Sequence, residues 1–251
     1  MFVTAAGSGI GAAIAKGFAD EGAMVHVCDV DAGALATLRG SHPAIQTAQV
    51  DVGEVGAVDE WVSGGLAALG GVDVLVNNAG IAGPTADVED VDYEEWRRCL
   101  AVGLDSHFLT CRRVAPVMKA QRSGSIVNIS STAGQLGYGR RTPYAAAKWA
   151  VIGLTKSLAI ELGPYGVTVN AICPGSVKGD RMDRVIAAQA AATGRAVEDI
   201  AADYTKSQSI GRFVEPEEIA AMCRFLASPE AAMVSGQAVA VDGHTETYHL
   251  S

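Results

Sequence analysis

The chain has 251 residues, 49% of them hydrophobic, which suits either one large α/β domain or two small ones. Its formal net charge of −9 disfavours a nucleic-acid-binding protein, because phosphate binding needs a basic surface. No apolar run approaches the roughly 20 residues of a membrane span, and no basic and then apolar leader opens the chain. We therefore expect a cytoplasmic protein that binds neither nucleic acid nor membrane.

Strand-like and helix-like segments alternate along the chain. Several of the strand-like segments are continuous apolar runs, which is typical of strands buried on both faces of a sheet. The predicted strands are Phe2–Ala5, Met24–Asp29, Ile45–Val52, Val72–Asn77, Ser125–Ser130, Val167–Ile172 and Ala238–Val241. The predicted helices are Ile10–Asp20, Val55–Leu69, Tyr93–Arg122, Pro143–Leu162 and Pro216–Leu226.

This alternation predicts an α/β fold in which right-handed crossovers build a parallel sheet with helices on both faces. No repeat or linker divides the chain, so we expect a single domain over residues 1–251. The alanine-rich segment Ile186–Ala202 interrupts the alternation, and we expect a substrate loop and helical insert at about residues 176–210. Because Met1–Val3 resembles the middle of a strand, we also expect the first strand to lack part of its N-terminal end.

The five cysteines are scattered and odd in number. They form no CxxC pair, so we expect neither a metal site nor a disulfide framework. We expect them to be small core residues in a reducing compartment. They are Cys28, Cys99, Cys111, Cys173 and Cys223.

A glycine-rich segment, Thr4–Gly11, lies between the first predicted strand and the first predicted helix. Small residues let the backbone turn sharply and approach a pyrophosphate, and a helix N-terminus offers N–H groups and a positive dipole end. Glycines also form ordinary turns, so the loop alone leaves that alternative open. The residues expected to contact a dinucleotide here are Gly7, Ser8, Gly9 and Ile10.

Asp29 ends the second predicted strand, 18 residues after Gly11. A carboxylate at this place can accept hydrogen bonds from ribose hydroxyls and repel a 2′-phosphate. No arginine or lysine follows until Arg39, so the sequence predicts NAD(H) as the cofactor rather than NADP(H). The alternative is an ordinary solvated loop aspartate.

Two more segments end predicted strands, where open α/β sheets bind their ligands. We expect Asp51 to bond an adenine amino group and Val52 to pack near the ring, whereas Asn77 is expected to tie neighbouring strands together. The residues after the fourth strand that are expected to contact the cofactor are Asn78, Ala79 and Gly80.

Tyr144 and Lys148 lie four residues apart in the predicted helix that begins at Pro143, capped by Thr142, so they project on one face. A nearby ammonium lowers the pKa of a phenol, and a general acid or base works best when its pKa approaches the working pH. The bare pattern also fits a surface pair on a helix. The preceding strand ends in Ser130 and Ser131, and a hydroxyl there can bond a substrate oxygen, although such serines commonly form turns.

Taken together, these blocks resemble the short-chain dehydrogenase/reductase family over nearly the whole chain. The family's order is followed by Thr4–Gly11, Asp51-Val52, Asn77–Gly80, Ser131 with Tyr144 and Lys148, and Pro174-Gly175. The gap of 13 residues from Ser131 to Tyr144 matches the family's usual gap and selects Ser131 over Ser130.

The resemblance implies a single-domain Rossmann fold with a doubly wound, seven-stranded parallel sheet. It implies that Tyr144 is the acid/base, that Lys148 holds the ribose and lowers the phenol's pKa, and that Ser131 orients the substrate. It further implies that Pro174, Gly175 and the backbone of Val177 meet the nicotinamide carboxamide.

The family is commonly tetrameric, which implies a homotetramer or a dimer here. The helices Tyr93–Arg122 and Pro143–Leu162 are expected at one interface and the tail Ser235–Ser251 at another. Residues Thr245–Ser251 are expected to be able to reach a neighbour's site.

Three positions depart from the family pattern. The usual first glycine of the loop is Ala5, the usual asparagine that helps hold a relay water is Gly103, and the usual threonine after Pro174-Gly175 is Gly179. The sequence does not orient Asp105, Ser106 or His107 as substitutes for that asparagine. Ala5 is expected to change the shape of the loop, Gly103 the proton relay and Gly179 the contact to the nicotinamide carboxamide, and none of them changes the expected reaction class.

Basic residues cluster in the variable segments that select substrates in this family. Arginine suits bidentate contacts to anions, so we expect a small-molecule substrate that is polar or anionic, such as a sugar acid or polyol. Solvated surface arginines and intersubunit salt bridges are the alternatives. The residues predicted to contact substrate are Arg140, Arg141, Lys178 and Arg181, and Arg184 lies nearby.

The function expected from all of this is NAD-dependent interconversion of a secondary alcohol and a ketone. A reductase of 3-oxoacyl groups on an acyl carrier protein is the alternative substrate class, which Asp29 disfavours because such reductases more often use NADP. A non-catalytic sensor or scaffold that binds NAD(H) is the alternative of another class, and Gly103 keeps it open.

Overall fold

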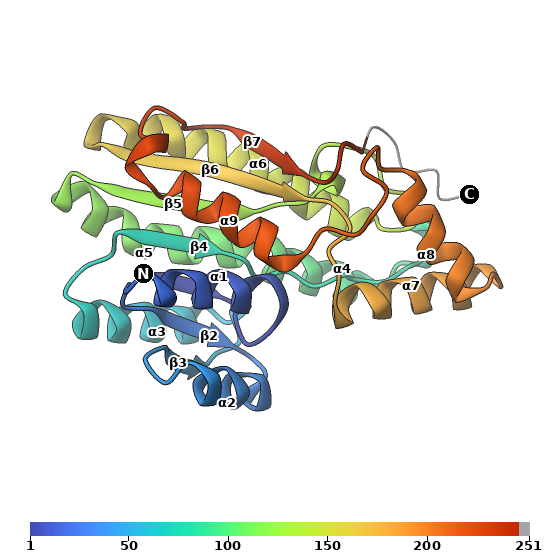
Figure 1. The fold of residues 1–251 in the computed structure, drawn as a ribbon, viewed down its shortest axis with the longest axis horizontal. Helices are drawn as coiled ribbons and strands as arrows, with labels where there is room; N and C mark the ends of the chain where they lie inside the picture. The colour runs from blue at the N-terminus through green and yellow to red at the C-terminus, as the bar shows by residue number, and fades with distance from the viewer. Residues whose placement is uncertain (246–251) are drawn as a thin grey trace.

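Within residues 1–245, which the computed structural model describes, the predicted strands all form and lie parallel in one seven-stranded sheet (Figure 1). The order across the sheet is β3-β2-β1-β4-β5-β6-β7. The strands are β1 (Phe2–Thr4), β2 (His26–Asp29), β3 (Gln46–Gln49), β4 (Val74–Asn77), β5 (Gly124–Ile129), β6 (Val167–Pro174) and β7 (Ala238–Val241). The predicted α/β fold class is confirmed.

The strand order reverses direction at β1, which pairs with β2 on one side and β4 on the other. Val3 is in register with Val27 of β2 and with Val76 of β4. The loops that leave β1 and β4 therefore diverge at their carboxyl ends, which is where doubly wound sheets bind ligands.

Helices cover both faces of the sheet. The long elements are α1 (Gly9–Asp20), α2 (Ala32–Ser41), α3 (Val55–Leu69), α4 (Tyr93–Leu100), α5 (Ser106–Gln121), α6 (Thr142–Leu162), α7 (Asp180–Thr193), α8 (Val197–Lys206) and α9 (Pro216–Leu226). Short helical turns are η1 (Val88–Asp90), η2 (Ala101–Asp105), η3 (Thr132–Gly134), η4 (Gly163–Tyr165) and η5 (Pro229–Ala231).

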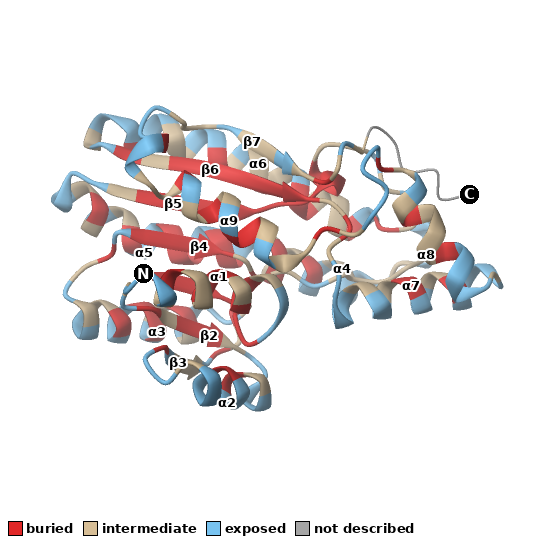
Figure 2. Ribbon diagram, in the orientation of Figure 1, coloured by how far each residue is buried: buried red, intermediate tan, exposed pale blue. Residues whose placement is uncertain are grey.

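Two apolar cores hold these layers together, one on each face of the sheet. On one face α1 and α9 pack together through residues such as Phe18 and Ile219. On the other face α3, α5 and α6 contribute residues such as Trp61, Met118 and Leu162. Figure 2 shows the central strands buried and the outer helix surfaces exposed. This two-sided burial explains the continuous apolar runs in the sequence.

Helix α2 is absent from the predicted elements. Its alanine- and glycine-rich sequence has a weak apolar face, and only Leu35 and Leu38 of the helix are buried. The side chain of Asp31 caps it by accepting from Gly33 N at 2.9 Å and Ala34 N at 3.0 Å. An aspartate followed by two leucines three residues apart was the available signal.

The predicted long helix Tyr93–Arg122 is divided. A π-helical turn, η2, separates α4 from α5 at Ala101–Asp105. Such turns are frequent at functional sites. Helix α6 begins one residue earlier than predicted, because Ala145 N bonds Arg141 O at 2.9 Å, so Arg141 and not Thr142 is the N-cap.

The irregular segment after β6 forms two helices, α7 and α8, beyond the carboxyl ends of the strands (Figure 1). They share a small apolar core built around Ile186, Ile200 and Tyr204. In the part of the chain that is described, no helix combines the length and apolarity needed to cross a membrane. The predicted reach of the tail toward a neighbouring subunit falls, after Thr245, outside the described residues.

Candidate active site

The loop between β1 and α1 is shaped by close backbone packing. A Cβ added to Gly11 would lie 2.5 Å from Ala5 O and 2.6 Å from Asn78 Nδ2, so no other residue fits there without a shift. Gly9 has φ of +53°, and a Cβ there would meet nothing within 4 Å. The loop is therefore tight on the sheet side and open on the other, which fits a bound diphosphate.

Strand β4 holds this loop through side-chain contacts. Thr4 Oγ1 accepts from Asn78 N at 3.0 Å and from Ala79 N at 3.1 Å. Asn78 Nδ2 donates to Ala5 O at 2.8 Å. The family's first loop glycine is Ala5 here, and it adopts φ of +50°, a conformation that strains any residue with a Cβ. Asn77 is buried and donates to Asn128 Oδ1 at 2.9 Å, tying β4 to β5.

Asp29 faces the same loop. Its Oδ2 accepts from Gly7 N at 2.8 Å, and its Oδ1 accepts from Asp31 N at 3.0 Å. These bonds fix the carboxylate at the end of β2, beside a second carboxylate on Asp31. Arg39 points elsewhere, since its Nη1 donates to Thr47 Oγ1 at 3.4 Å.

Asp51 already has a cationic partner. Arg98 Nη2 of α4 lies 2.7 Å from Asp51 Oδ2, and Gly53 N donates to Oδ1 at 2.9 Å. Burial of the carboxyl acts to raise its pKa, but the bonds from Arg98 and Gly53 lower it overall. Val52, beside it, is buried in the turn that follows β3, which ends at Gln49 and thus earlier than predicted.

The structure brings Ser131, Tyr144 and Lys148 together. Tyr144 hydrogen-bonds to the side chain of Ser131. Lys148 Nζ lies 5.9 Å from the centroid of the Tyr144 ring and donates to Ile129 O at 2.7 Å. Ser130 faces away from this group, because its hydroxyl donates to Lys148 O at 2.8 Å inside the core.

Charges around the phenol outweigh the effect of its burial. Burial acts to raise the pKa of Tyr144, whereas Arg181, Lys148, the hydrogen bond from Ser131 and Arg141 together bring it below its ordinary value. Burial likewise lowers the pKa of Lys148, which is only 2% exposed, and Tyr144 opposes that effect. Gly80 leaves room for this ammonium, since a Cβ on it would lie 3.0 Å from Lys148 Nζ.

A buried histidine lies one helical turn after Gly103. Burial, reinforced by the charge of Lys148, lowers the pKa of His107 to about 3, so its imidazole is neutral. His107 Nε2 lies 3.2 Å from Ala79 O, which can only accept, so Nε2 carries the proton. Nδ1 is then a buried acceptor without a hydrogen bond of regular geometry, although a side-chain contact with Asn128 acts to raise the pKa of His107. Of its neighbours, Ser106 is also buried and Asp105 is exposed.

Two of the four predicted substrate cations lie against Tyr144. Arg141 Cζ is 5.3 Å and Arg181 Cζ is 5.6 Å from the centroid of its ring. The structure does not bring the other two there. Arg140 pairs with Asp87 at 3.3 Å, and the 67% exposed side chain of Lys178 pairs with Glu215 at 3.3 Å.

The chain turns sharply after β6. A Cβ on Gly175 would lie 2.8 Å from Asp242 Cα, so β6 and the end of β7 approach closely just after Pro174. Val177 then pairs with Val214 in a parallel bridge, and Gly179 adopts φ of +134° before α7. The usual threonine cannot adopt this backbone conformation without strain.

A family model described as enoyl-(acyl carrier protein) reductase matches residues 4–244. The chain belongs to the short-chain dehydrogenase/reductase family. It is 38% identical over 252 residues to the granaticin polyketide synthase putative ketoacyl reductase 1 of Streptomyces violaceoruber, covering 98% of this chain and 92% of that protein. It is 37% identical over 242 residues to the 2-keto-3-deoxy-L-fuconate dehydrogenase of Xanthomonas campestris pv. campestris, covering 96% of this chain and 78% of that protein.

The short-chain dehydrogenase/reductase fold is also found in a similar solved structure. The crystal structure of levodione reductase superposes with a TM-score of 0.90 and 32% identity, covering 96% of this chain and 95% of that one. The chain is thus an oxidoreductase that acts on alcohol and ketone groups.

Sequence reasoning missed three features of this dehydrogenase's site. Arg98 beside Asp51 gave no signal, because the two are far apart in the chain. His107 was visible in the sequence but its burial was not. The contact between Tyr138 and Tyr204 joins segments 66 residues apart, and no local pattern predicts it.

Proposed function

We propose that the protein is an NAD(H)-dependent dehydrogenase that interconverts a secondary alcohol and a ketone on a small polar or anionic substrate. The observation that carries this proposal is the cluster of Ser131, Tyr144 and Lys148 with two guanidinium groups beside the phenol. It supplies a proton carrier and an anion-binding surface at one place.

In the oxidative direction, the substrate's hydroxyl proton passes to the ionised oxygen of Tyr144. A bound nicotinamide would supply the acceptor for the hydride on the carbon that bears this hydroxyl, and loss of the proton and the hydride converts the alcohol to a ketone. Lys148 stabilises the phenolate before the proton arrives. Ser131 donates a hydrogen bond to the substrate oxygen and orients it, and reduction runs the same steps backward.

The proposed preference for NAD(H) rests on charge at the end of β2. Asp29 and Asp31 lie where a 2′-phosphate would bring more negative charge, and Arg39 is engaged with Thr47. The residues proposed to hold the cofactor are Gly7, Ser8, Gly9, Ile10, Asp29, Asp51, Val52, Asn78, Ala79, Gly80, Tyr144, Lys148, Pro174, Gly175 and Val177.

The proposed anionic substrate rests on the exposed guanidinium of Arg181, to which Arg141 adds a buried positive charge. Arg141 is only 4% exposed, and its Nη2 donates to Ala82 O at 2.7 Å. Planar guanidinium groups suit a carboxylate. The relative from Xanthomonas campestris is named for 2-keto-3-deoxy-L-fuconate, which is a keto acid. A hydroxy acid or sugar acid is therefore our first choice of substrate, and polyols are the second.

The direct test follows NADH absorbance with purified protein, NAD and a panel of hydroxy acids, sugar acids and polyols. We expect turnover with at least one hydroxy acid and slower turnover when NADP replaces NAD. Binding of NADH without turnover of any compound would favour a cofactor-sensing protein instead.

Asp29→Ala tests the cofactor assignment. We expect the ratio of kcat/KM for NAD to that for NADP to fall roughly tenfold or more, since one repulsive carboxylate is removed. Asp73→Ala is the control, because this exposed carboxylate lies at the other end of the sheet. An unchanged ratio in Asp29→Ala would remove this residue from the ribose site.

A ketoacyl reductase is the second candidate, which the relative from Streptomyces violaceoruber favours. It predicts fast oxidation of NADPH with a 3-oxoacyl thioester on a carrier protein. It also predicts that a free carboxylate on the substrate does not increase kcat/KM. Comparing such a thioester with a 3-oxo acid under NADPH and NADH separates the two candidates.

We further propose a cytoplasmic homotetramer or dimer. Large apolar side chains are exposed along the helices that would pack between subunits, namely Tyr93, Phe108, Trp149 and Ile160. Light scattering after size exclusion measures the assembly.

A further inference from the structure

The two segments that connect the insert, which contains α7 and α8, to the rest of the chain are bonded to each other. Val177 pairs with Val214, and Lys178 N donates to Val214 O at 2.9 Å while Val214 N donates to Ser176 O at 2.9 Å. An ion pair between Lys178 and Glu215 lies beside this bridge. The insert therefore leaves and re-enters the sheet domain at one fixed point.

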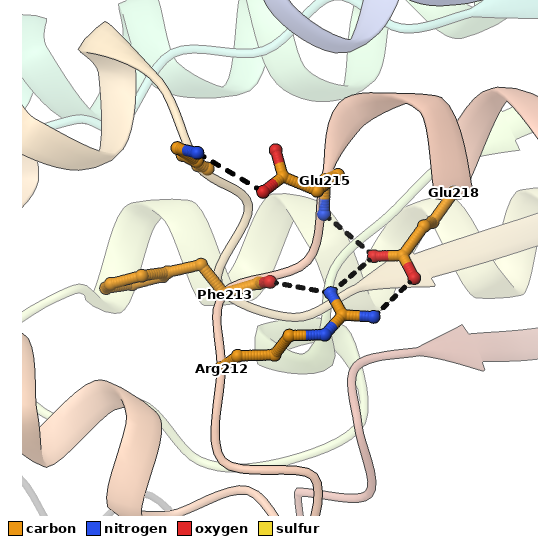
Figure 3. Close-up of polar contacts among 5 residues, drawn as sticks. Arg212, Phe213, Glu215 and Glu218 are labelled. Atoms are coloured by element: carbon orange, nitrogen blue, oxygen red, sulfur yellow. Dashed lines mark hydrogen bonds and ion pairs between the residues drawn. The ribbon is translucent and has the colours of Figure 1, made fainter.

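The return from the insert into α9 is also fixed by charge. Figure 3 shows Arg212, Glu215 and Glu218 around the N-terminus of α9. Arg212 binds both carboxylate oxygens of Glu218, at 2.7 and 2.8 Å, and Glu218 Oε2 accepts from Glu215 N at 2.9 Å. The bonds from Arg212 and Glu215 lower the pKa of Glu218 to about 2, so the ion pair between Arg212 and Glu218 stays charged near neutral pH.

The insert is docked on the segment that precedes the catalytic helix. Tyr138, from the loop before α6, packs against the small core of the insert. Its hydroxyl bonds that of Tyr204 on α8, and Tyr204 OH donates to Gln189 Oε1 on α7 at 2.8 Å. The Tyr138 ring also lies 5.4 Å from Arg141 Cζ. Docking of the insert and the surroundings of Tyr144 are thus physically connected.

Arg181 is the residue that the insert presents to the active site. The turn at Gly179, with φ of +134°, starts α7 so that Arg181 Cζ lies 5.6 Å from the Tyr144 ring centroid. Arg181 is exposed, and it takes part in none of the ion pairs formed within residues 1–245. Its charge is available to the phenol and to a bound anion.

We infer that Arg181 is a positioning residue that stabilises the Tyr144 phenolate from the insert, so that docking of the insert helps to activate the base. The groups facing the phenol come from three segments: Ser131 and Tyr138 precede α6, Arg141 and Lys148 belong to its first turns, and Arg181 comes from α7. Among the charges, Arg181 has the largest effect in lowering the pKa of Tyr144, ahead of Lys148. That the phenolate acts as the catalytic base rests on the proposed function.

Direct titration of Tyr144 tests the inference without a substrate. The chain has six tyrosines, so the phenolate absorbance of wild type minus that of Tyr144→Phe isolates this one. For the variant, the phenolate absorbance of Arg181→Gln minus that of the double variant Arg181→Gln/Tyr144→Phe isolates Tyr144 in the same way. We expect Arg181→Gln to ionise at higher pH, with at least about threefold less phenolate at the wild-type midpoint.

Two variants separate charge from structure. Arg181→Lys keeps a cation and should retain part of the effect, whereas Arg184→Gln removes the same charge from the next turn of α7 and should leave the midpoint in place. Because Arg181 is exposed, the difference between wild type and Arg181→Gln should shrink at high salt. Thermal unfolding of each variant shows whether the fold is retained.

The outcomes distinguish this inference from the proposed function. An unchanged Tyr144 midpoint in folded Arg181→Gln would overturn the inference even if the enzyme oxidises alcohols. If Arg181→Gln shifts the ionisation midpoint of Tyr144 but the wild-type protein oxidises no alcohol, the role of Arg181 is supported and the proposed function is wrong. An equal shift in Arg184→Gln would show a general charge effect and would also overturn it.

Discussion

The cofactor end and the substrate end of this site are built by different means. At the cofactor end, backbone groups and short polar side chains hold the loop, as in the contacts of Asn78 with Ala5 and of Gly7 with Asp29. At the substrate end, long cationic side chains from separate segments converge on one phenol, as Arg141 and Arg181 do on Tyr144.

This difference indicates which part of the site selects the cofactor and which part selects the substrate. Backbone packing fixes a shape that tolerates almost no added atom on the side facing the sheet, so changes on that side should affect cofactor binding and stability together. Converging side chains fix a charge pattern, so changes there should affect substrate affinity and ionisation while the fold stays intact.

Gly11→Ala should have the largest effect on the cofactor end. The added Cβ meets Ala5 O and Asn78 Nδ2 at 2.5 and 2.6 Å, which forces a shift worth about 1–3 kcal/mol. We expect NADH affinity, followed by fluorescence, to fall roughly tenfold to a hundredfold. Gly64→Ala in α3 has open space and should leave affinity unchanged. Equal affinities for both variants would mean that the loop is not tightly packed.

Arg141→Gln should break the substrate end selectively. Loss of this buried positive charge beside the phenol should raise KM for a hydroxy acid by about tenfold and leave NADH affinity unchanged. KM for a neutral polyol should change little. Arg140→Gln is the matched control, because its charge is directed to Asp87. If both variants raised KM equally, the convergence on Tyr144 would not explain substrate binding.

Ala5→Gly should produce the smallest effect, and a favourable one. Ala5 has φ of +50°, which costs about 1–2 kcal/mol for a residue with a Cβ. The greater freedom of glycine in the unfolded chain offsets part of that gain. We expect the free energy of unfolding, from denaturant titration, to rise by roughly 0.5–1 kcal/mol. A loss of stability would show that Ala5 is not strained.

The strands were predictable because their patterns are local and strong. All seven were located, and α3 and α9 have the predicted bounds, because most of the strands are apolar runs and glycine or proline marks many boundaries. The exception is β3, whose sequence Gln46–Gln49 has no buried residue and whose predicted bounds were too long. Helix α2 was missed because only Leu35 and Leu38 mark its buried face. The break at η2 was missed although Gly103 lies in it, because a single glycine inside a helical pattern is commonly tolerated.

The site was predictable to the extent that chemistry follows spacing within one element. The helical spacing put Tyr144 and Lys148 on one face, and the resemblance to the family, through the gap of 13 residues, added Ser131 to the predicted site. The separation of Arg141 and Arg181 from Arg140 and Lys178 was not predictable, because Asp87 and Glu215 reach the latter pair only through the folded chain. Burial of His107 depends on tertiary packing in the same way.

Activity of Tyr144→Phe across pH tests the central proposal most directly. In wild type, kcat/KM for alcohol oxidation should rise with pH as the phenol ionises and level off below its ordinary pKa of about 10, because nearby charges lower that pKa. Tyr144→Phe should reduce turnover by roughly 10³-fold at every pH, whereas NADH affinity should fall far less because the ring and the other cofactor contacts are kept. A variant that keeps turnover and the same rising profile would contradict the assignment of Tyr144 as the group that exchanges the proton.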